Sequence, residues 1–435
     1  MIIYSHTITS RLQYVIDFLS RYFSHPFKLT ANEKLYTSSV DGKINYSHQQ
    51  ISSDEIYILP HALLFETEKR KVTIHTSEFN GYKYFFQTTG DVKFDLFAAI
   101  FYLLSRYEEY LPHKKDEYGR YAHENSLAHH EGFLNLPLIN IWLEDFRKLL
   151  AQQNSKFPIH SSRFTFIPTY DIDIAWSYKN KGFKRNTAGF LQSVVKGDFS
   201  KVSERIKVIK ERVADPFDSY EWLHEIHQEH DLDPIYFFLV ADKKSKYDKN
   251  IDITNPEFQQ LIKSIASKNK IGLHPSWASG DDNSLLVKEK SFLEQLTERQ
   301  VTSSRQHFVR FDLPKTFQRL ITVGITNDYS MGYGSINGFR ASIATPFFWY
   351  DLQNEQATKL TIHPFCYMDA NSYYEQNLSP EEAMQELQYY YQVIKSVKGT
   401  MTTIWHNNFL GVDKEFEGWR EVYEQLIQTV STASK

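Results

Sequence analysis

Cysteine is almost absent from this chain of 435 residues, because Cys366 is the single one. A disulfide framework within the chain is therefore excluded, and we expect a reducing compartment. No apolar run approaches the roughly 18 residues that a transmembrane helix needs, so no membrane span is expected. The first residues lack a basic segment followed by an unbroken apolar one, so no secretory signal peptide is expected. These absences together predict a cytoplasmic protein.

Positive charge is not in excess either, since 49 Lys and Arg stand against 53 Asp and Glu, for a formal net charge of −4. A broad nucleic-acid surface needs clustered Lys and Arg, so nucleic acid is not an expected partner. Aromatic residues are abundant instead, at 15% with 28 Tyr and 32 Phe. Aromatic side chains stack on sugars and also fill packed cores, and composition leaves both interpretations open.

The clearest domain boundary is the polar segment from Gln152 to Ser162, which contains Pro158. It follows an expected amphipathic helix over residues 138–151. Ahead of it, short strand-like runs mix with helical patterns, and the one at 94–111 is apolar nearly all round and is expected to be buried. We therefore predict an N-terminal α/β domain over residues 1–155 and a second domain over 163–435.

From Arg163 onward, seven apolar strand-like runs recur, and helical patterns separate several of them. This alternation predicts parallel β-α-β units. Seven such strands suggest a distorted (β/α)7-type barrel, in which catalytic residues lie at the carboxyl ends of strands. The predicted strands cover residues 164–173, 234–242, 270–276, 304–311, 325–330, 359–365 and 401–407.

Polar residues stand at the ends of these strands. Asp171 and Asp173 follow an apolar run and point to one face if the segment is extended. Converging carboxylates need a cation, a shared proton or solvent, although Asp is also common in turns and helix caps. His274, His307 and His406 close other runs, and each alone is equally typical of a structural histidine or a solvated edge strand.

Taken together with Arg305, the two carboxylates and three histidines form the inventory of a hydrolytic metal site. Zinc accepts His nitrogen and Asp oxygen, and a catalytic site keeps one position open for water. The metal activates that water and polarises a carbonyl, while a carboxylate accepts a proton and a His returns one to the leaving group.

The order of the motifs resembles the polysaccharide deacetylase (NodB-homology) family. Thr169-Tyr170-Asp171-Ile172-Asp173 is similar to the Asp-x-Asp form of the family's first motif. That resemblance implies Asp171 as the general base and Asp173 as a metal ligand. The second family motif has two His four residues apart. Here His274 is present, but Ala278 stands where the second His is expected.

The later motifs carry the resemblance further. Arg305-Gln306-His307-Phe308 resembles the family's Arg-x-Pro-Tyr motif, which implies that Arg305 orients the base and that the Phe308 N–H helps to bind the oxyanion. Ile404-Trp405-His406 resembles the final motif, which implies His406 as the general acid. Residues 94–113 resemble the hallmark of an N-terminal domain of unknown role found in a divergent bacterial branch of the family.

The resemblance implies a divalent metal, for which we expect zinc, held by Asp173 and His274, and we expect His307 as the third ligand. His307 replaces the absent second His, and His363 is the reserve ligand. We assign the expected substrate contacts to Phe308, Trp277, Arg340 and Trp405.

The predicted function is a metal-dependent hydrolase, a carbohydrate N- or O-deacetylase acting on a sugar-containing substrate. Two alternatives stay open. One is a catalytically silent carbohydrate-binding or scaffold protein, which the missing second His favours. The other is a hydrolase of different C–N bonds.

Overall fold

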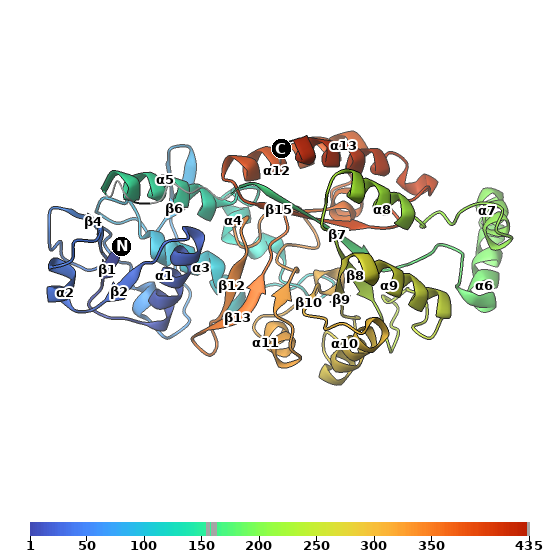
Figure 1. Ribbon diagram of the computed structural model, residues 1–435, viewed down its shortest axis with the longest axis horizontal. Helices are drawn as coiled ribbons and strands as arrows, with labels where there is room; N and C mark the ends of the chain where they lie inside the picture. The colour runs from blue at the N-terminus through green and yellow to red at the C-terminus, as the bar shows by residue number, and fades with distance from the viewer. Residues whose placement is uncertain (154–156, 158–162, 433–435) are drawn as a thin grey trace.

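Two separate sheets organise the described part of the chain, which comprises residues 1–153, 157 and 163–432 of this computed structural model (Figure 1). A four-stranded sheet lies within the first 57 residues, and a nine-stranded sheet lies between residues 165 and 406. Helices connect the strands of both, so the predicted mixed α/β class is confirmed. The predicted boundary falls largely outside the described residues, and the division into two domains stays a prediction.

The N-terminal sheet is parallel, with its strands in the order β2-β1-β3-β4. An antiparallel hairpin, β5–β6, follows it in the chain. The strands are β1 (Ile2–Tyr4), β2 (Lys28–Thr30), β3 (Lys43–Asn45), β4 (Glu55–Tyr57), β5 (Thr76–Phe79) and β6 (Tyr82–Phe85). The helices of this part are α1 (Ser10–Tyr22), α2 (Glu33–Thr37), α3 (Leu96–Leu104), α4 (Leu127–His130) and α5 (Leu138–Gln153).

Helix α3 is the centre of the N-terminal core. All nine of its residues are buried, as its apolar sequence predicts. The side chain of Asp95 caps the helix by accepting a hydrogen bond from the Ala98 N–H. After α3 comes a 3₁₀ turn, Tyr107–Tyr110, which carries charged side chains toward the second part of the chain.

The nine-stranded sheet has the order β12-β13-β11-β10-β9-β8-β7-β15-β14. Its pairs are parallel except for β12 with β13. Its strands are β7 (Thr165–Ile172), β8 (Ile235–Leu239), β9 (Lys270–His274), β10 (Ser303–Ser304), β11 (Asn327–Asp328), β12 (Phe347–Asp351), β13 (Gln356–Ile362), β14 (Tyr367–Met368) and β15 (Thr400–His406).

Helices follow most of these strands, as the alternation predicts. They begin at the residues that favour helix starts: Asn255 caps α9 ahead of Pro256, and Ser379 and Glu382 form a capping box on α12. The helices are α6 (Gly182–Val195), α7 (Phe199–Ile209), α8 (Tyr220–Glu229), α9 (Pro256–Lys268), α10 (Asn283–Thr297), α11 (Lys315–Thr322), α12 (Pro380–Ser396) and α13 (Trp419–Thr432).

The sheet differs from the predicted barrel in two ways. Among the described residues no pairing joins β12 to β14, so closure into a barrel stays a prediction. The predicted strand at 304–311 ends after Ser304, because Phe308 and Val309 adopt left-handed backbone angles of φ 59° and φ 53° that a strand cannot contain. None of the described helices combines the length and the hydrophobicity needed to span a bilayer.

The two parts of the chain share one hydrophobic core, which runs from α1 and α3 to β12 and β13. Buried ion pairs accompany it. The Arg11 guanidinium donates to Glu355, and the Arg340 guanidinium donates to Glu109, which also accepts from Arg106. Arg106 and Glu109 therefore lie at the contact between the two parts of the chain.

Candidate active site

Strand β7 places two carboxylates on one side of the sheet edge, two residues apart. The Arg305 guanidinium donates from Nη1 to Asp171 Oδ1 over 2.8 Å, and both side chains are almost fully buried. Arg305 is itself fixed, because its Nε donates to the Tyr329 carbonyl and its guanidinium lies 4.5 Å from the ring centre of Phe237. Asp171 Oδ2 stays directed at His274, 3.8 Å from its Nε2.

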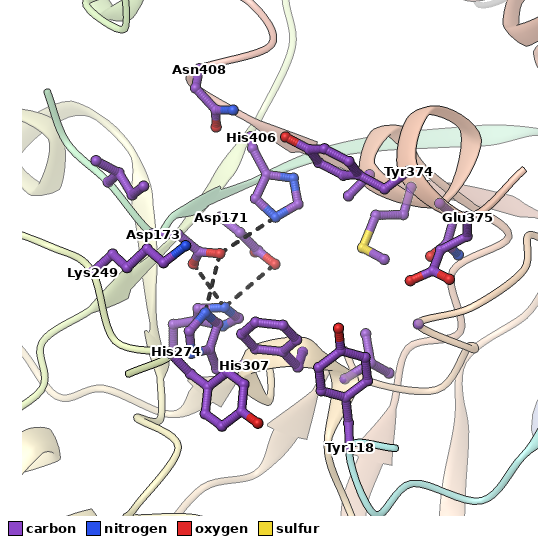
Figure 2. A pocket seen from close by; sticks show the side chains of 18 of the residues that line it. Tyr118, Asp171, Asp173, Lys249, His274, His307, Tyr374, Glu375, His406 and Asn408 are labelled. Atoms are coloured by element: carbon purple, nitrogen blue, oxygen red, sulfur yellow. Dashed lines mark ion pairs between the residues drawn. The ribbon is translucent and has the colours of Figure 1, made fainter. Parts of the chain in front are cut away.

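Asp173 lies between two histidines. Its Oδ1 is 3.1 Å from His274 Nε2, and its Oδ2 is 3.3 Å from His307 Nε2. One ligand atom from each of these three residues lies within 4.8 Å of the others (Figure 2). The two histidines come from β9 and from the turn after β10, which are separated from β7 by β8 in the sheet.

Each histidine is oriented by a partner on its far nitrogen. His274 Nδ1 lies 2.6 Å from the Arg305 carbonyl, an acceptor, so Nδ1 carries a proton, and Nε2 faces Asp173. His307 Nδ1 lies 3.4 Å from Asp248 Oδ1. Asp248 is held in turn by hydrogen bonds from Ser245 and from the Trp277 N–H. Such carboxylate and carbonyl partners are typical of metal-binding histidines.

The charges of this group depend on one another. Burial raises the pKa of Asp173, but His307 and His274 more than offset this and hold it well below its usual value. Burial lowers the pKa of His307, and Asp173 and Asp248 outweigh it and raise that pKa to about 9. The group therefore attracts positive charge, whether a proton on His307 or a cation among the three side chains.

His406 faces the same carboxylates from the end of β15. Its Nδ1 lies 2.6 Å from Asp369 Oδ1, and its Nε2 is 3.7 Å from Asp173 Oδ2. Burial lowers the pKa of His406, but the buried Asp369, with help from Asp173 and Asp171, raises it to about 10. In the sheet register His406 is the direct partner of Asp171. A protonated imidazole therefore stands beside the first carboxylate.

These side chains open into a cavity of about 520 Å³. Figure 2 shows Tyr118, Lys249, Tyr374, Glu375 and Asn408 arranged around it. Aromatic rings gather on one side of the cavity. The ring centres of Tyr118 and Phe308 are 5.2 Å apart, and those of the stacked Trp277 and Tyr247 are 3.9 Å apart. Aromatic faces and a few polar groups are the usual lining of a site for a small organic ligand or sugar.

The N-terminal part of the chain contributes directly to this cavity. Glu117, Tyr118 and Arg120 line it, on a tight loop whose backbone N–H groups are held by Asp116. Arg120 donates from Nη1 to the Phe308 carbonyl over 2.9 Å. This bond holds the left-handed turn that carries His307, so residues before 155 help to shape the site.

The structure brings most of the predicted site residues together. Asp171, Asp173, His274, Arg305, His307 and His406 form the contacts described above, and Phe308 lines the cavity. Their catalytic and ligand roles stay predictions.

Four predicted residues lie elsewhere. Arg340 is buried, its guanidinium pairs with Glu109, and it does not line the cavity. Trp405 is fully buried beside Tyr367 and Tyr423 and does not line the cavity. Trp277 stands behind Tyr247, with the Arg310 guanidinium over its ring. The reserve ligand His363 stacks on Tyr329 and hydrogen-bonds Asn327, away from Asp173.

Sequence reasoning missed three contributors. Asp248 and Lys249 lie in a loop without strand or helix periodicity, and Tyr118 belongs to the other part of the chain. Asp369 was not missed, because its place at the end of a strand-like run predicts it from the sequence.

The donor set fits a divalent metal ion. Two imidazole nitrogens and one carboxylate converge, and the buried Asp173 Oδ1 receives no well-aligned hydrogen bond. An unpaired buried carboxylate oxygen is costly unless a cation neutralises it. Three protein ligands with an open side toward a cavity are the pattern of catalytic rather than structural zinc sites.

Comparisons with known proteins add little beyond this geometry. A family model described as "Family of unknown function (DUF7033)" matches residues 1–155. No curated protein matches the chain.

Among solved structures, similarity is found to proteins described as polysaccharide deacetylases. One from Mycobacterium smegmatis has 13% identity and a TM-score of 0.40, covering 63% of this chain and 86% of that one. One from Pseudomonas aeruginosa PAO1 has 11% identity and a TM-score of 0.40, covering 62% and 86%. A CE4 family pseudoenzyme from Bacillus anthracis has 11% identity and a TM-score of 0.30, covering 62% and 63%. At such low scores, the chemistry has to be argued from the residues of the site.

Proposed function

We propose that this protein is a metal-dependent hydrolase that removes an N- or O-linked acetyl group from a sugar-containing substrate. One observation supports the proposal: a carboxylate held by an arginine, a group of one carboxylate and two histidines, and a histidine paired with a buried carboxylate face one cavity. His274 lies 3.8 Å from Asp171 and 3.1 Å from Asp173, and His406 lies 3.7 Å from Asp173.

In this proposal the residues divide the reaction between them. Asp171 accepts the proton of the attacking water through Oδ2, because Oδ1 is engaged by Arg305. His406, kept protonated by Asp369, donates a proton to the departing amine or alcohol. The N–H of Phe308, in the turn fixed by Arg120, is the proposed donor to the oxyanion.

Asp173, His274 and His307 would hold the divalent ion, for which we propose zinc. When bound, such an ion supplies Lewis-acid chemistry by lowering the pKa of water and polarising the substrate carbonyl. His307 takes the place left by Ala278, because the turn after β10 brings its Nε2 to 3.3 Å from Asp173 Oδ2, beside the ring of His274. The missing second His therefore leaves three ligands in place.

The substrate class follows from the cavity. Its aromatic side, with Tyr118 and Phe308, suits the apolar face of a sugar ring, and Lys249, Glu375 and Asn408 offer partners for hydroxyl groups. A second candidate is a silent sugar-binding protein, favoured by the departure at Ala278. A third is hydrolysis of another C–N bond by the same groups.

Acetate release from a panel of acetylated compounds separates the three candidates. The panel contains N-acetylglucosamine oligomers, a nucleotide-linked N-acetyl sugar, O-acetylated xylose oligomers and N-acetyl amino acids. We expect zinc-dependent release from at least one sugar, abolished by chelator and restored by zinc. Sugar binding without acetate release would overturn the hydrolase in favour of the silent protein. Release from the amino acids alone would favour the third candidate.

A further inference from the structure

Helices α6 and α7 form a hairpin that stands apart from the sheets. In Figure 1 it lies at one end of the long axis, beyond α8 and α9, and two extended connections join it to the rest. The hairpin follows β7 directly in the chain, and its turn contains Gly197 at φ 72°. Only Ser193 and Val208 are buried within the two helices. The hairpin therefore adds almost nothing to the core.

Its apolar side chains face outward instead. Phe183 is 84% exposed, Val195 87% and Phe199 68%. Phe183, Leu191 and Val194 share one helical stripe on α6, by their spacing, and Phe199 and Ile206 share one on α7. The exposed large hydrophobic side chains of this segment are Phe183, Leu191, Val194, Val195, Phe199, Ile206, Ile209 and Val213. A patch of this kind marks an interaction surface.

The same segment is strongly basic. Residues 179–214 contain ten Lys and Arg against three Asp and Glu, a net charge of +7 in a chain whose total is −4. Lys184, Lys196, Lys207 and Lys210 are exposed on the helices. Basic residues beside exposed aromatic and aliphatic ones are the pattern of helices that lie on anionic membrane surfaces.

The base of the hairpin is fixed close to the cavity. The buried carboxylate of Asp215 accepts hydrogen bonds from the N–H groups of Ser177, Tyr178 and Lys179. Arg185, in the first turn of α6, donates to the carbonyls of Lys249 and Asn250. Lys249 lines the cavity, so whatever the hairpin binds is held at a fixed position relative to the site.

We propose that the α6–α7 hairpin docks the protein on an anionic phospholipid surface, with the apolar side chains entering the headgroup region and the lysines pairing with lipid phosphates. A nucleic acid would not explain the exposed apolar stripes. A second copy of the hairpin would bring two +7 surfaces together. The inference does not depend on the chemistry of the cavity, so it can fail or hold independently of the proposed hydrolase.

Vesicle co-sedimentation of the full chain tests the proposal. The probes are vesicles of phosphatidylcholine alone and of phosphatidylcholine with 30% phosphatidylglycerol, a composition we choose for the assay, at low and high salt. We expect binding to the anionic vesicles and its loss at high salt. Phe183→Ser/Val195→Ser/Phe199→Ser should weaken binding at least about tenfold. Lys184→Gln/Lys196→Gln/Lys210→Gln should weaken it on the order of 100-fold at low salt, at about fivefold per lysine.

A matched variant, Leu35→Ser/Val40→Ser/Phe79→Ser, removes exposed apolar groups from the N-terminal part and should bind like the wild type. Circular dichroism and the melting temperature report whether each variant is folded. Wild-type protein that ignores anionic vesicles would overturn the proposal, as would hairpin variants that bind as well as the wild type. Tight binding to a DNA duplex without vesicle binding, or dimerisation abolished by the apolar variant, would assign the surface to nucleic acid or to a second copy instead.

Discussion

Asp171 and Asp173 leave the same strand on the same face, yet their carboxylates contact different partners. Asp171 is paired with the fixed guanidinium of Arg305, whereas Asp173 lies between His274 and His307. A carboxylate with one oxygen anchored and the other directed at the site suits proton transfer. A carboxylate between two imidazoles suits a cation. This difference in surroundings is the reason to expect different effects from the same substitution.

Asp171→Asn should lower turnover by about 10²–10⁴-fold, since it removes the proton acceptor but keeps the shape of the side chain. Zinc content and melting temperature should change little. Asp173→Asn should instead lower zinc content, because it removes a ligand charge. Acetate release and elemental analysis of both purified variants measure these effects. Equal loss of zinc in the two variants would contradict the division of roles.

Asp369→Asn should move the alkaline limb of the activity profile to lower pH. Asp369 raises the pKa of His406, and an acid must keep its proton to act. Activity is therefore lost as the pH rises through the pKa of His406, and removal of the carboxylate lowers that pKa. The measurement is kcat/KM between pH 6 and 10 for the wild type and the variant, in steps of about half a unit. An unshifted limb would show that another group sets it.

At this scale, sequence reasoning finds residues that end strands. Asp171, His274 and His406 each follow an apolar run, and the sheet brings such positions together. It does not find Asp248, because the path of a loop is set by tertiary contacts. It also misplaces Arg340, because a lone Arg carries no sequence signal that tells a buried ion pair from a substrate contact.

At the scale of elements, the turn over His307–Val309 is the most dependent on its neighbours. Two consecutive non-glycine residues in left-handed angles are unfavourable and persist only when surrounding contacts hold them. Arg120 supplies one such contact, from a loop almost 190 residues earlier. Polar and apolar residues alternate over 304–311, and this pattern predicts a strand. The local pattern does not reveal the distant contact from Arg120 that holds the turn.

Tyr118→Ala should raise the KM for a sugar substrate about three- to tenfold, because the substrate loses one aromatic contact. The kcat should change less. The reason is that the Tyr118 ring lies against Phe308 on the cavity wall without contacting the catalytic groups. Steady-state kinetics and the quenching of Trp277 fluorescence by an N-acetylglucosamine oligomer measure the change. Tyr82→Ala, on strand β6, is the matched control. An unchanged KM together with unchanged fluorescence titration would remove Tyr118 from the substrate site.

The α6–α7 hairpin shows a different limit on prediction. Its helices do carry apolar stripes, but these stripes do not face the core. A hydrophobic pattern indicates which side of a helix avoids water and leaves open what covers that side. The helical spacing of apolar residues predicts other helices well, such as α9 and α12, because their apolar sides pack on the sheet.

At the scale of the whole molecule, one core and a buried charge cluster join the N-terminal part to the nine-stranded sheet. Glu109 receives hydrogen bonds from both Arg106 and Arg340. The composition and strand alternation predict the α/β class, but they do not reveal this junction or the order of the strands. Both depend on contacts between residues more than 200 positions apart.

Glu109→Gln should lower the free energy of unfolding by about 3 kcal/mol, because it removes the carboxylate that pairs with the buried Arg340 and one of the two that pair with the buried Arg106. Burial raises the pKa of Glu109, but Arg340 and Arg106 more than offset it and lower that pKa to about 2. The stabilisation is thus complete above the unfolded pKa of about 4.5 and is lost as the pH falls toward 2.

Urea unfolding followed by tryptophan fluorescence measures both effects. The wild type should lose more stability than the variant between pH 5 and 3, and Glu78→Gln on the exposed strand β5 is the control. The shared core also leads us to expect a single unfolding transition. Two separate transitions, with the variant affecting neither, would mean that the two parts fold independently and that the cluster is unimportant.

The pairing of Asp171 with His406 across β7 and β15 has a consequence for how the protein is made. A ribosome adding roughly 5–20 residues per second needs about 10 to 50 s to travel from the first of these strands to the second. During that interval one edge of β7 has no partner strand. Proteins that bind the growing chain can cover such an edge. The proposed base and acid therefore meet only after strand β15 has been made, more than 230 residues after Asp171.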